Sequence, residues 1–305
     1  MRNISVAAKA ALLGILCASA AVPSALAAVA PKDWTFTIDE SAGDHAMGLT
    51  PKDVTRFSTR SSRDFPLTTI PDKMDLRDQI SPIQNQAKCG SCWAFSLTAT
   101  ARDSLLLAGK DPGDLSQQYL VDCAENDNGC SGGYFDAADS LIRPKGAPSQ
   151  ADYPYTAKDG TCQNKPVKGS ILAWHMIGSG SGPSTRDIEA VMTARHAPVS
   201  AVVAAGAGHW KQYSSGVYNE CAAGAQMDHM INIVGWDNEG AAFDSKGSLP
   251  PGKGVWIVRN SWGATWGEKG WMRIKMTDAQ GNLCSSLASV AAYFDVVESD
   301  LFQLN

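Results

Sequence analysis

Cysteine pairing is the feature that most limits how this chain can fold, and it depends on the start of the sequence. The chain has 305 residues and eight cysteines. Its first 30 residues contain an apolar run, residues 10–22, that is too short to span a bilayer. Ala25-Leu26-Ala27 follows with the small residues of a signal-peptidase site. Residues 1–27 are therefore predicted to be a secretory signal peptide rather than a buried helix.

Removal of this signal takes Cys17 with it and leaves an odd number of cysteines. An exported chain meets an oxidising compartment, where disulfides are expected. Three pairs leave one free thiol, which needs an explanation in a secreted protein. The residues alone do not say which cysteine is free. The seven that remain are Cys89, Cys92, Cys123, Cys130, Cys162, Cys221 and Cys284.

Composition and charge exclude several classes of partner. The chain is 44% hydrophobic, enough for a sizeable core, and its formal net charge of -5 argues against binding nucleic acid. No stretch outside the signal is long and apolar enough to cross a membrane. We therefore expect a secreted or periplasmic protein with no nucleic-acid partner and no membrane attachment after signal removal.

The pattern of polar and apolar residues changes near residue 70. Residues 28–69 are polar and weakly periodic, with a possible strand at 34–38, a turn into a helix at 48–54 and a linker at 56–69. Such a segment cannot fold alone, and we interpret it as a short propeptide. Residues 70–305 then form the folded domain.

Helical patterns come first in this domain and strand patterns follow. Apolar residues recur every three or four positions over residues 92–108, with Ser91 as a possible N-cap, and residues 115–123 read as a second helix. Short strand-like runs follow at 197–205, 229–237, 254–260 and 271–276. The order predicts an α+β fold in two lobes, helical over about 80–180 and β over about 181–295.

Cys89 and Cys92 form a C-x-x-C pair, which has three common interpretations. A zinc site needs a second such pair or closely spaced histidines, and a redox pair needs a thioredoxin-like βαβ context. Neither is present in the sequence. One structural cysteine beside one working cysteine fits the odd count. Cys92 lies in the first turn of the predicted helix, where the helix dipole favours a thiolate.

A nucleophilic thiol also needs a base. Among five histidines, His229 opens a predicted strand, whereas His45 lies in the segment interpreted as propeptide. Asn260 ends another predicted strand. Its amide oxygen is suited to accept from one ring nitrogen of His229 and leave the other to face the thiol.

Six sequence blocks together resemble the papain–cathepsin family of cysteine peptidases. The blocks occur in the family's order and cover essentially all of residues 70–293. They are QNQAKCGSCWAFS (84–96), LSQQYLVDC (115–123), GCSGGYF (129–135), DYPYTAKDGTC (152–162), MDHMINIVGW (227–236) and VRNSWGATWGEKGWMRI (258–274). The resemblance implies a two-lobed fold with an antiparallel, barrel-like β lobe and an active site in the cleft between the lobes.

The resemblance also implies roles for individual residues. Cys92 is the nucleophile, His229 the general base and acid, and Asn260 the group that orients His229. Gln86 and the backbone N–H of Cys92 stabilise the oxyanion. The residues implied to bind substrate are Gly132, Gly133, Tyr134, Phe135, Val202, Met227, Met230 and Trp262, with Ser289 or Val290 at the floor of the pocket.

These pocket residues are uncharged, so we expect an apolar substrate side chain two residues before the scissile bond. Met230 stands where the family usually has a small residue, which predicts a shallower pocket. The same residues are equally suited to a plain hydrophobic core.

The disulfide pairing is likewise implied by the resemblance. It is Cys89–Cys130, Cys123–Cys162 and Cys221–Cys284, which leaves Cys92 as the free thiol. Each bridge closes a loop of a few dozen residues, worth about 3–4 kcal/mol in a loop-entropy model.

The sequence thus predicts a secreted cysteine endopeptidase made as a zymogen, without metal or cofactor. We expect a monomer that acts on proteins or peptides and is inhibited by its own propeptide. The signal suits a bacterium. The alternatives are a catalytically altered binding relative, a transpeptidase, or an exopeptidase whose groove is blocked by residues 238–253 or by the tail 295–305.

Overall fold

The structure is a computed structural model that describes residues 35–298 except 56, 66–68, 126, 179–181 and 222–223. The predicted signal peptide lies outside the described residues. The helices are α1 (Cys92–Leu107), α2 (Gln117–Cys123) and α3 (Thr185–Arg195), with short 3-10 helices η1 (Ser62–Asp64), η2 (Gly129–Ser131), η3 (Phe135–Leu141) and η4 (Cys284–Ser286). The strands are β1 (Phe36–Ile38), β2 (Thr59–Arg60), β3 (Lys73–Asp75), β4 (Ala173–Ile177), β5 (Val199–Val203), β6 (Tyr213–Tyr218), β7 (His229–Asp237), β8 (Val255–Arg259), β9 (Trp271–Lys275) and β10 (Ala291–Asp295).

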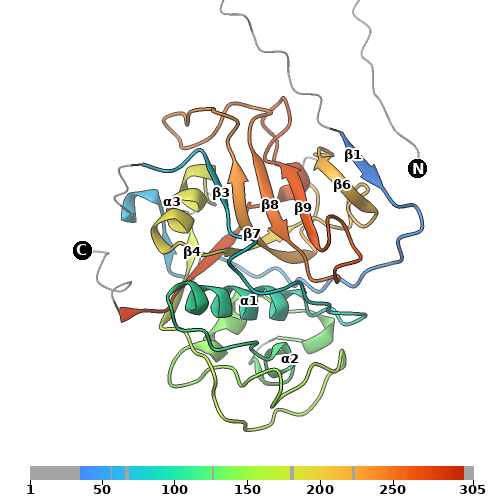
Figure 1. Ribbon diagram of the computed structural model, residues 1–305, viewed down its shortest axis with the longest axis vertical. Helices are drawn as coiled ribbons and strands as arrows, with labels where there is room; N and C mark the ends of the chain where they lie inside the picture. Colours follow the sequence, from blue (N-terminus) through green and yellow to red (C-terminus); the bar gives the residue numbers. More distant parts are fainter. Residues whose placement is uncertain are drawn as a thin grey trace, which may run out of the picture.

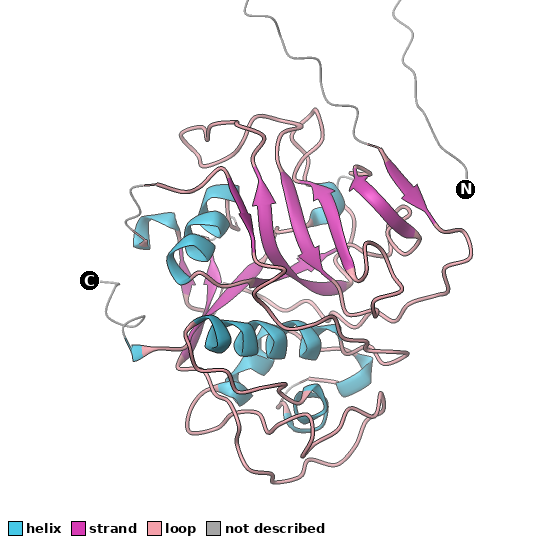
Figure 2. Cartoon of the chain, viewed as in Figure 1, coloured by secondary structure: helices cyan, strands magenta, loops and turns pink. Residues whose placement is uncertain are grey.

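Helix α1 lies between the sheet and α2, whereas α3 lies on the sheet side of α1, as Figures 1 and 2 show. Almost all of its residues are buried. A helix that is buried on all sides needs no polar face, so its mostly apolar sequence fits this central position. Ser91 occupies the predicted N-cap position, but its side chain makes no capping hydrogen bond. Its hydroxyl bonds the Tyr155 hydroxyl at 2.6 Å instead.

The β lobe is one sheet in the order β1-β6-β9-β8-β7-β5-β10-β4-β2, with β3 paired to β7. It is mixed rather than wholly antiparallel, because β6 pairs with β9 and β2 with β4 in parallel. Strands β7 and β8 are buried along nearly their whole length. The predicted α+β class and two lobes are confirmed.

The two lobes have separate hydrophobic cores. One core lies in the β lobe and includes five buried tryptophans, Trp210, Trp236, Trp256, Trp262 and Trp266. The other surrounds α1. The sheet includes β1, β2, β3 and β4, which all precede residue 181, so the β lobe extends beyond its predicted boundary.

Three disulfides link the cysteines in the pairs that the resemblance implies. They are Cys89–Cys130, Cys123–Cys162 and Cys221–Cys284. Cys92 is the one free cysteine of the described residues. Within the same residues, no helix is long and apolar enough to cross a membrane. No group of three metal-ligating side chains is found there either.

Residues 35–65 attach to the domain at both ends and cross between the lobes. β1 pairs antiparallel with β6, and β2 pairs in parallel with β4. Figure 1 shows this segment in blue, running from β1 toward α3 between the sheet and α1. Residues 48–54 contain no helix, so that expectation is wrong. The expected linker at 56–69 includes β2, η1 and the buried Phe65.

Candidate active site

The Cys92 thiol lies at the N-terminal end of α1 and is fully buried. The backbone amide groups of Met230, Gly48 and Trp93 lie beside its sulfur, where each acts to lower the pKa of the thiol. Met230 follows His229 along β7, so this contact places the thiol beside the strand that carries the predicted base.

His229 and Asn260 meet at the neighbouring ends of β7 and β8. The His229 Nε2 and Asn260 Oδ1 atoms are 2.8 Å apart. The Asn260 oxygen also accepts from the backbone N–H of Ser261 at 2.8 Å, which fixes the amide orientation. His229 Nδ1 is buried and has no hydrogen-bond partner among the described residues. No described group therefore occupies that nitrogen.

The indole ring of Trp262 covers the imidazole. The two ring centroids are 4.7 Å apart, and both side chains are buried. Such a cover keeps water from the His229–Asn260 hydrogen bond and so strengthens it.

Gln86 presents a fixed amide group to the same cleft. Its Oε1 atom accepts from the Ser261 hydroxyl at 2.6 Å, so Nε2 is turned toward the cleft. Nε2 donates to the carbonyl oxygens of Cys89 at 2.9 Å and Ala46 at 3.0 Å. Ser261 was not among the predicted site residues, although its hydroxyl lies next to Asn260 in the sequence and could have suggested a role.

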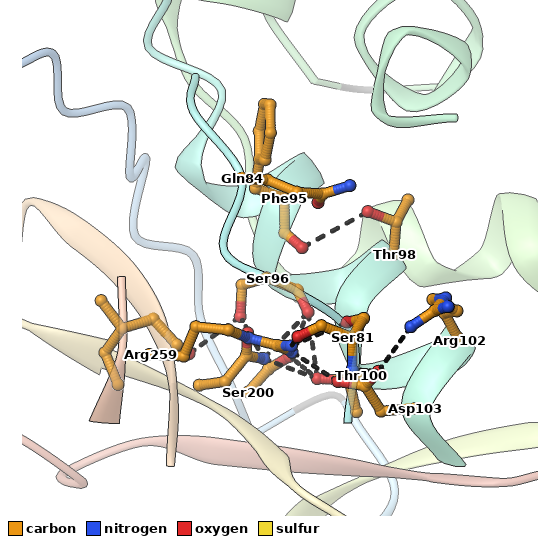
Figure 3. A network of polar contacts seen from close by, with 12 residues as sticks. Ser81, Gln84, Phe95, Ser96, Thr98, Thr100, Arg102, Asp103, Ser200 and Arg259 are labelled. Atoms are coloured by element: carbon orange, nitrogen blue, oxygen red, sulfur yellow. Dashed lines mark hydrogen bonds and ion pairs between the residues drawn. The ribbon is translucent and has the colours of Figure 1, made fainter. Parts of the chain in front are cut away.

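A buried polar network ties the elements of the site together (Figure 3). Arg259 precedes Asn260 on β8 and bonds Asp103 on α1 at 2.6 Å. It also donates to Asn232 on β7 at 3.2 Å and to the Ser81 hydroxyl at 2.8 Å. The guanidinium group of Arg259, on β8, thus links this strand to α1, which carries Cys92, and to β7, which carries His229.

Burial sets the charge state of the thiol and the imidazole in this form of the molecule. It raises the pKa of Cys92 to about 11 and lowers the pKa of His229 to about 4. Both groups are neutral near pH 7. The expected thiolate–imidazolium pair is therefore disfavoured while the cleft is covered.

Residues 45–50 cover the cleft. The Ala46 carbonyl accepts from Gln86 Nε2 and, at 3.2 Å, from Trp262 Nε1. The His45 ring stacks on Trp262 with centroids 4.4 Å apart. The Gly48 carbonyl accepts from Gly133 N–H and the Thr50 N–H donates to the Gly133 carbonyl, both at 3.0 Å.

The covering segment needs a glycine at position 48, where it passes the Cys92 thiol. A Cβ on Gly48 would lie 1.6 Å from the Gly90 carbonyl oxygen. Gly133 is similarly restricted, because a Cβ there would lie 2.5 Å from the Trp93 ring. Of the two glycines predicted to offer bare backbone, Gly133 pairs with an extended segment, and that segment belongs to this chain. The backbone groups of Gly132 bond Gly129 and Asn128 instead.

The predicted pocket residues gather beside Gly133. Tyr134, Phe135, Val202 and Met230 are buried in the core around α1, and Met227 and Val290 pack against it. Leu49 packs against the same cluster. Ser289 donates to the Met227 sulfur at 3.2 Å, which joins the predicted floor to a wall. Tyr134, Phe135, Val202 and Met230 are thus part of the core around α1, and their part in binding substrate stays a prediction.

The remaining histidines lie elsewhere and have other partners. Nitrogens of His175, His196 and His209 lie 2.7–3.1 Å from Asp295, Gln79 and Glu220. His45 stacks on Trp262 from the covering segment, and His229 is the one described histidine with a hydrogen bond to Asn260.

Comparison with known proteins agrees with this geometry. The model of the papain family of cysteine proteases matches residues 70–293. The chain belongs to the papain family.

Curated members of the papain family align with most of this chain. A senescence-specific cysteine protease of Arabidopsis thaliana is 37% identical over 231 residues, which are 73% of this chain and 62% of that protein. Cysteine protease 1 of rice is 33% identical over 81% of this chain and 49% of its own length. The chain thus spans about half to three fifths of these relatives.

Solved papain-family structures include precursor forms. Procathepsin L2 from Tenebrio molitor larval midgut is 29% identical with a TM-score of 0.68, covering 86% of this chain and 84% of that one. The stem bromelain precursor covers 87% of this chain and 84% of its own, at 28% identity and TM-score 0.66. Bromelain with the E64 inhibitor covers only 75% of this chain but 100% of its own length, at 32% identity and TM-score 0.60. The precursors therefore align with more of this chain than that protease does.

Proposed function

We propose that this chain is a secreted cysteine endopeptidase made as a zymogen, with residues 28–69 as its propeptide and 70–305 as the enzyme. One observation carries the proposal. The backbone of Gly48 lies on the Cys92 sulfur while the carbonyl of Ala46 takes the amide of Gln86. The chain's own segment thus covers the nucleophile and occupies the donor assigned to the oxyanion.

Removal of that segment exposes the groups needed for acyl transfer. The thiol passes its proton to His229 Nδ1 and attacks the peptide carbonyl carbon. Gln86 Nε2 and the backbone N–H of Cys92 hold the oxyanion. His229 then protonates the leaving amine, and later takes a proton from the water that hydrolyses the thioester.

Asn260 and Trp262 act through His229. Asn260 Oδ1 accepts from Nε2, so the imidazole is held with Nδ1 toward the thiol. The substrate backbone pairs with Gly133, and an apolar side chain enters the pocket now faced by Leu49. We propose an apolar preference there because the lining is uncharged.

The exopeptidase alternative receives no support from the loop 238–253. Its described contacts include α3, β9 and the residue before β3, since Arg186 N–H donates to the Gly247 carbonyl, Lys275 bonds Glu239, and Gly240 N–H donates to Asp72. The start of the C-terminal tail lies beside Arg143, which bonds Glu298 at 2.8 Å. Neither segment has a described contact with Cys92 or His229.

The leader and the disulfides favour export, so we propose a secreted or periplasmic monomer. The bacterial origin that the signal suggests stays a prediction, and the relatives named above come from plants and an insect.

Expression of the full chain and of its Cys92→Ala variant tests the function. The parent protein should lose residues 28–69 and cleave internal bonds of end-capped peptides, and a thiol alkylator should stop both reactions. The Cys92→Ala variant should keep the segment and cleave nothing. A parent protein that binds peptides without cleaving them would favour the altered relative, and transfer to an added amine would favour the transpeptidase.

A further inference from the structure

Two carboxylates beside the predicted substrate groove hold an ammonium group from the covering segment. Lys52 Nζ lies 2.9 Å from Asp127 Oδ1 and 2.8 Å from Asp136 Oδ1. The Asp127 side chain is 1% exposed, that of Asp136 11% and that of Lys52 18%. This is a largely desolvated cation site, in which charged hydrogen bonds are stronger than at the surface.

The two carboxylates are positioned by the backbone that binds the extended segment. Asp127 Oδ1 also accepts from the Tyr134 N–H at 3.0 Å, directly after Gly133. Asp136 lies in the first turn of η3, two residues further on. Asp127 Oδ2 is buried and has no partner among the described residues. One acceptor in the site thus remains available for a ligand with several donors.

The place of Lys52 along the segment locates the site relative to the thiol. Gly48 lies on Cys92, Thr50 bonds Gly133, and Lys52 lies two residues beyond Thr50. The carboxylates therefore lie on the far side of Gly133 from the nucleophile. An extended chain advances about 3.3 Å per residue, so roughly the third or fourth residue before the scissile bond would reach them.

We infer that, in the processed enzyme, Asp127 and Asp136 form a subsite for a lysine or arginine side chain on the acyl side of the substrate. The inference rests on the proposed function, because it requires that residues 28–69 leave. Lys52 fills the site in the precursor and shows which chemistry it accepts. The substrate class is then a basic residue followed, toward the scissile bond, by an apolar one.

Matched peptides test this subsite on the processed enzyme. One set carries lysine and the other alanine at the third or the fourth residue before the scissile bond, with one apolar residue fixed at the second. Lysine at one of these positions should raise kcat/KM roughly tenfold, through KM, because a charged hydrogen bond contributes at least a factor of this size. The gain should shrink as salt is added.

Variants separate the subsite from the general charge of the protein. Asp136→Asn should remove the lysine preference and leave the alanine peptide unaffected, and Asp127→Asn should do the same if it folds. Glu125→Gln changes an exposed acid two residues from Asp127 and should leave the preference intact. Equal cleavage of the lysine and alanine peptides at both positions, or a preference that survives Asp136→Asn, would overturn the subsite. A protein that cleaves neither peptide would contradict the proposed function as well.

Discussion

Gly48 shows how one residue without a side chain can decide whether a cleft is covered. Its backbone touches the nucleophile and passes so close to Gly90 that no Cβ fits. The sequence shows only one glycine in a polar stretch, and this does not predict that its backbone packs against Gly90. The same stretch therefore looked like a turn leading into a helix.

Gly48→Ala should weaken the seating of the covering segment. Overpacking costs about 1–3 kcal/mol, so the unprocessed protein should gain roughly tenfold in alkylator-sensitive peptidase activity. Gly43→Ala is the matched control, because a Cβ at Gly43 meets nothing within 4 Å. Equal activity of the two variants would show that the Gly48 contact does not close the site.

The buried carboxyl group of Glu189 makes the stability of the folded protein depend on pH. Burial raises its pKa to about 8, although Asn238 donates to its Oε2 atom at 2.9 Å. A raised pKa means that the folded state holds a proton that the unfolded state has lost. Its contribution to stability is complete below about pH 4.5 and is lost as the pH rises to about 8.

Glu189→Gln should remove this pH dependence. The parent protein should lose up to a few kcal/mol between pH 5 and pH 8 from this residue, and the variant should lose less. Thermal melting at both pH values measures the difference. A variant whose melting temperature falls as steeply as that of the parent protein would exclude a protonated Glu189.

At the scale of elements, the active site depends on how α1, β7 and β8 are joined. The Arg259–Asp103 pair joins β8 to α1, with side chains 4% and 0% exposed. Removal of one partner from a buried pair costs about 3–5 kcal/mol, because the other charge is left without compensation.

Arg259→Met should therefore destabilise the protein by about 3–5 kcal/mol. Lys73→Met is the control, since the Lys73–Asp237 pair also joins two strands but its side chains are 67% and 37% exposed. That variant should lose less than about 1 kcal/mol. Chemical unfolding of both variants gives the comparison, and similar losses would argue against a special role for the buried network.

The strands and helices that bury their own apolar residues were predictable. The α1 helix and the β7 strand agree with their predicted ranges within a residue, because each has a clear apolar pattern. β1 lies inside the strand expected at 34–38, whereas β2 was not predicted and forms through pairing with β4, which is distant in sequence. The Ser91 hydroxyl likewise does not cap α1 as predicted, because it bonds the hydroxyl of Tyr155, which is 64 residues away in the sequence.

At the scale of the whole molecule, the candidate residues Cys92, His229, Asn260 and Gln86 were found from motif and chain position. Their environment was not, since it depends on residues 45–50 folding across the cleft. The sequence suggested a thiolate at a helix start, and the covered cleft instead raises the pKa of that thiol. The local sequence pattern was enough to locate the candidate catalytic residues. The protonation state of Cys92 depends on tertiary contacts that the pattern does not contain.

We propose that residues 28–69 cover and neutralise Cys92. The rate at which iodoacetamide alkylates Cys92, measured before and after these residues are removed, tests this claim. Cys92 is the free cysteine of the described chain, so mass spectrometry can follow it alone. The unprocessed protein should react slowly at pH 7, with a rate that rises about tenfold per pH unit toward pH 11. The processed enzyme should react at least roughly a hundredfold faster at pH 7. Equal rates for the two forms would contradict the claim that this segment covers and neutralises the nucleophile.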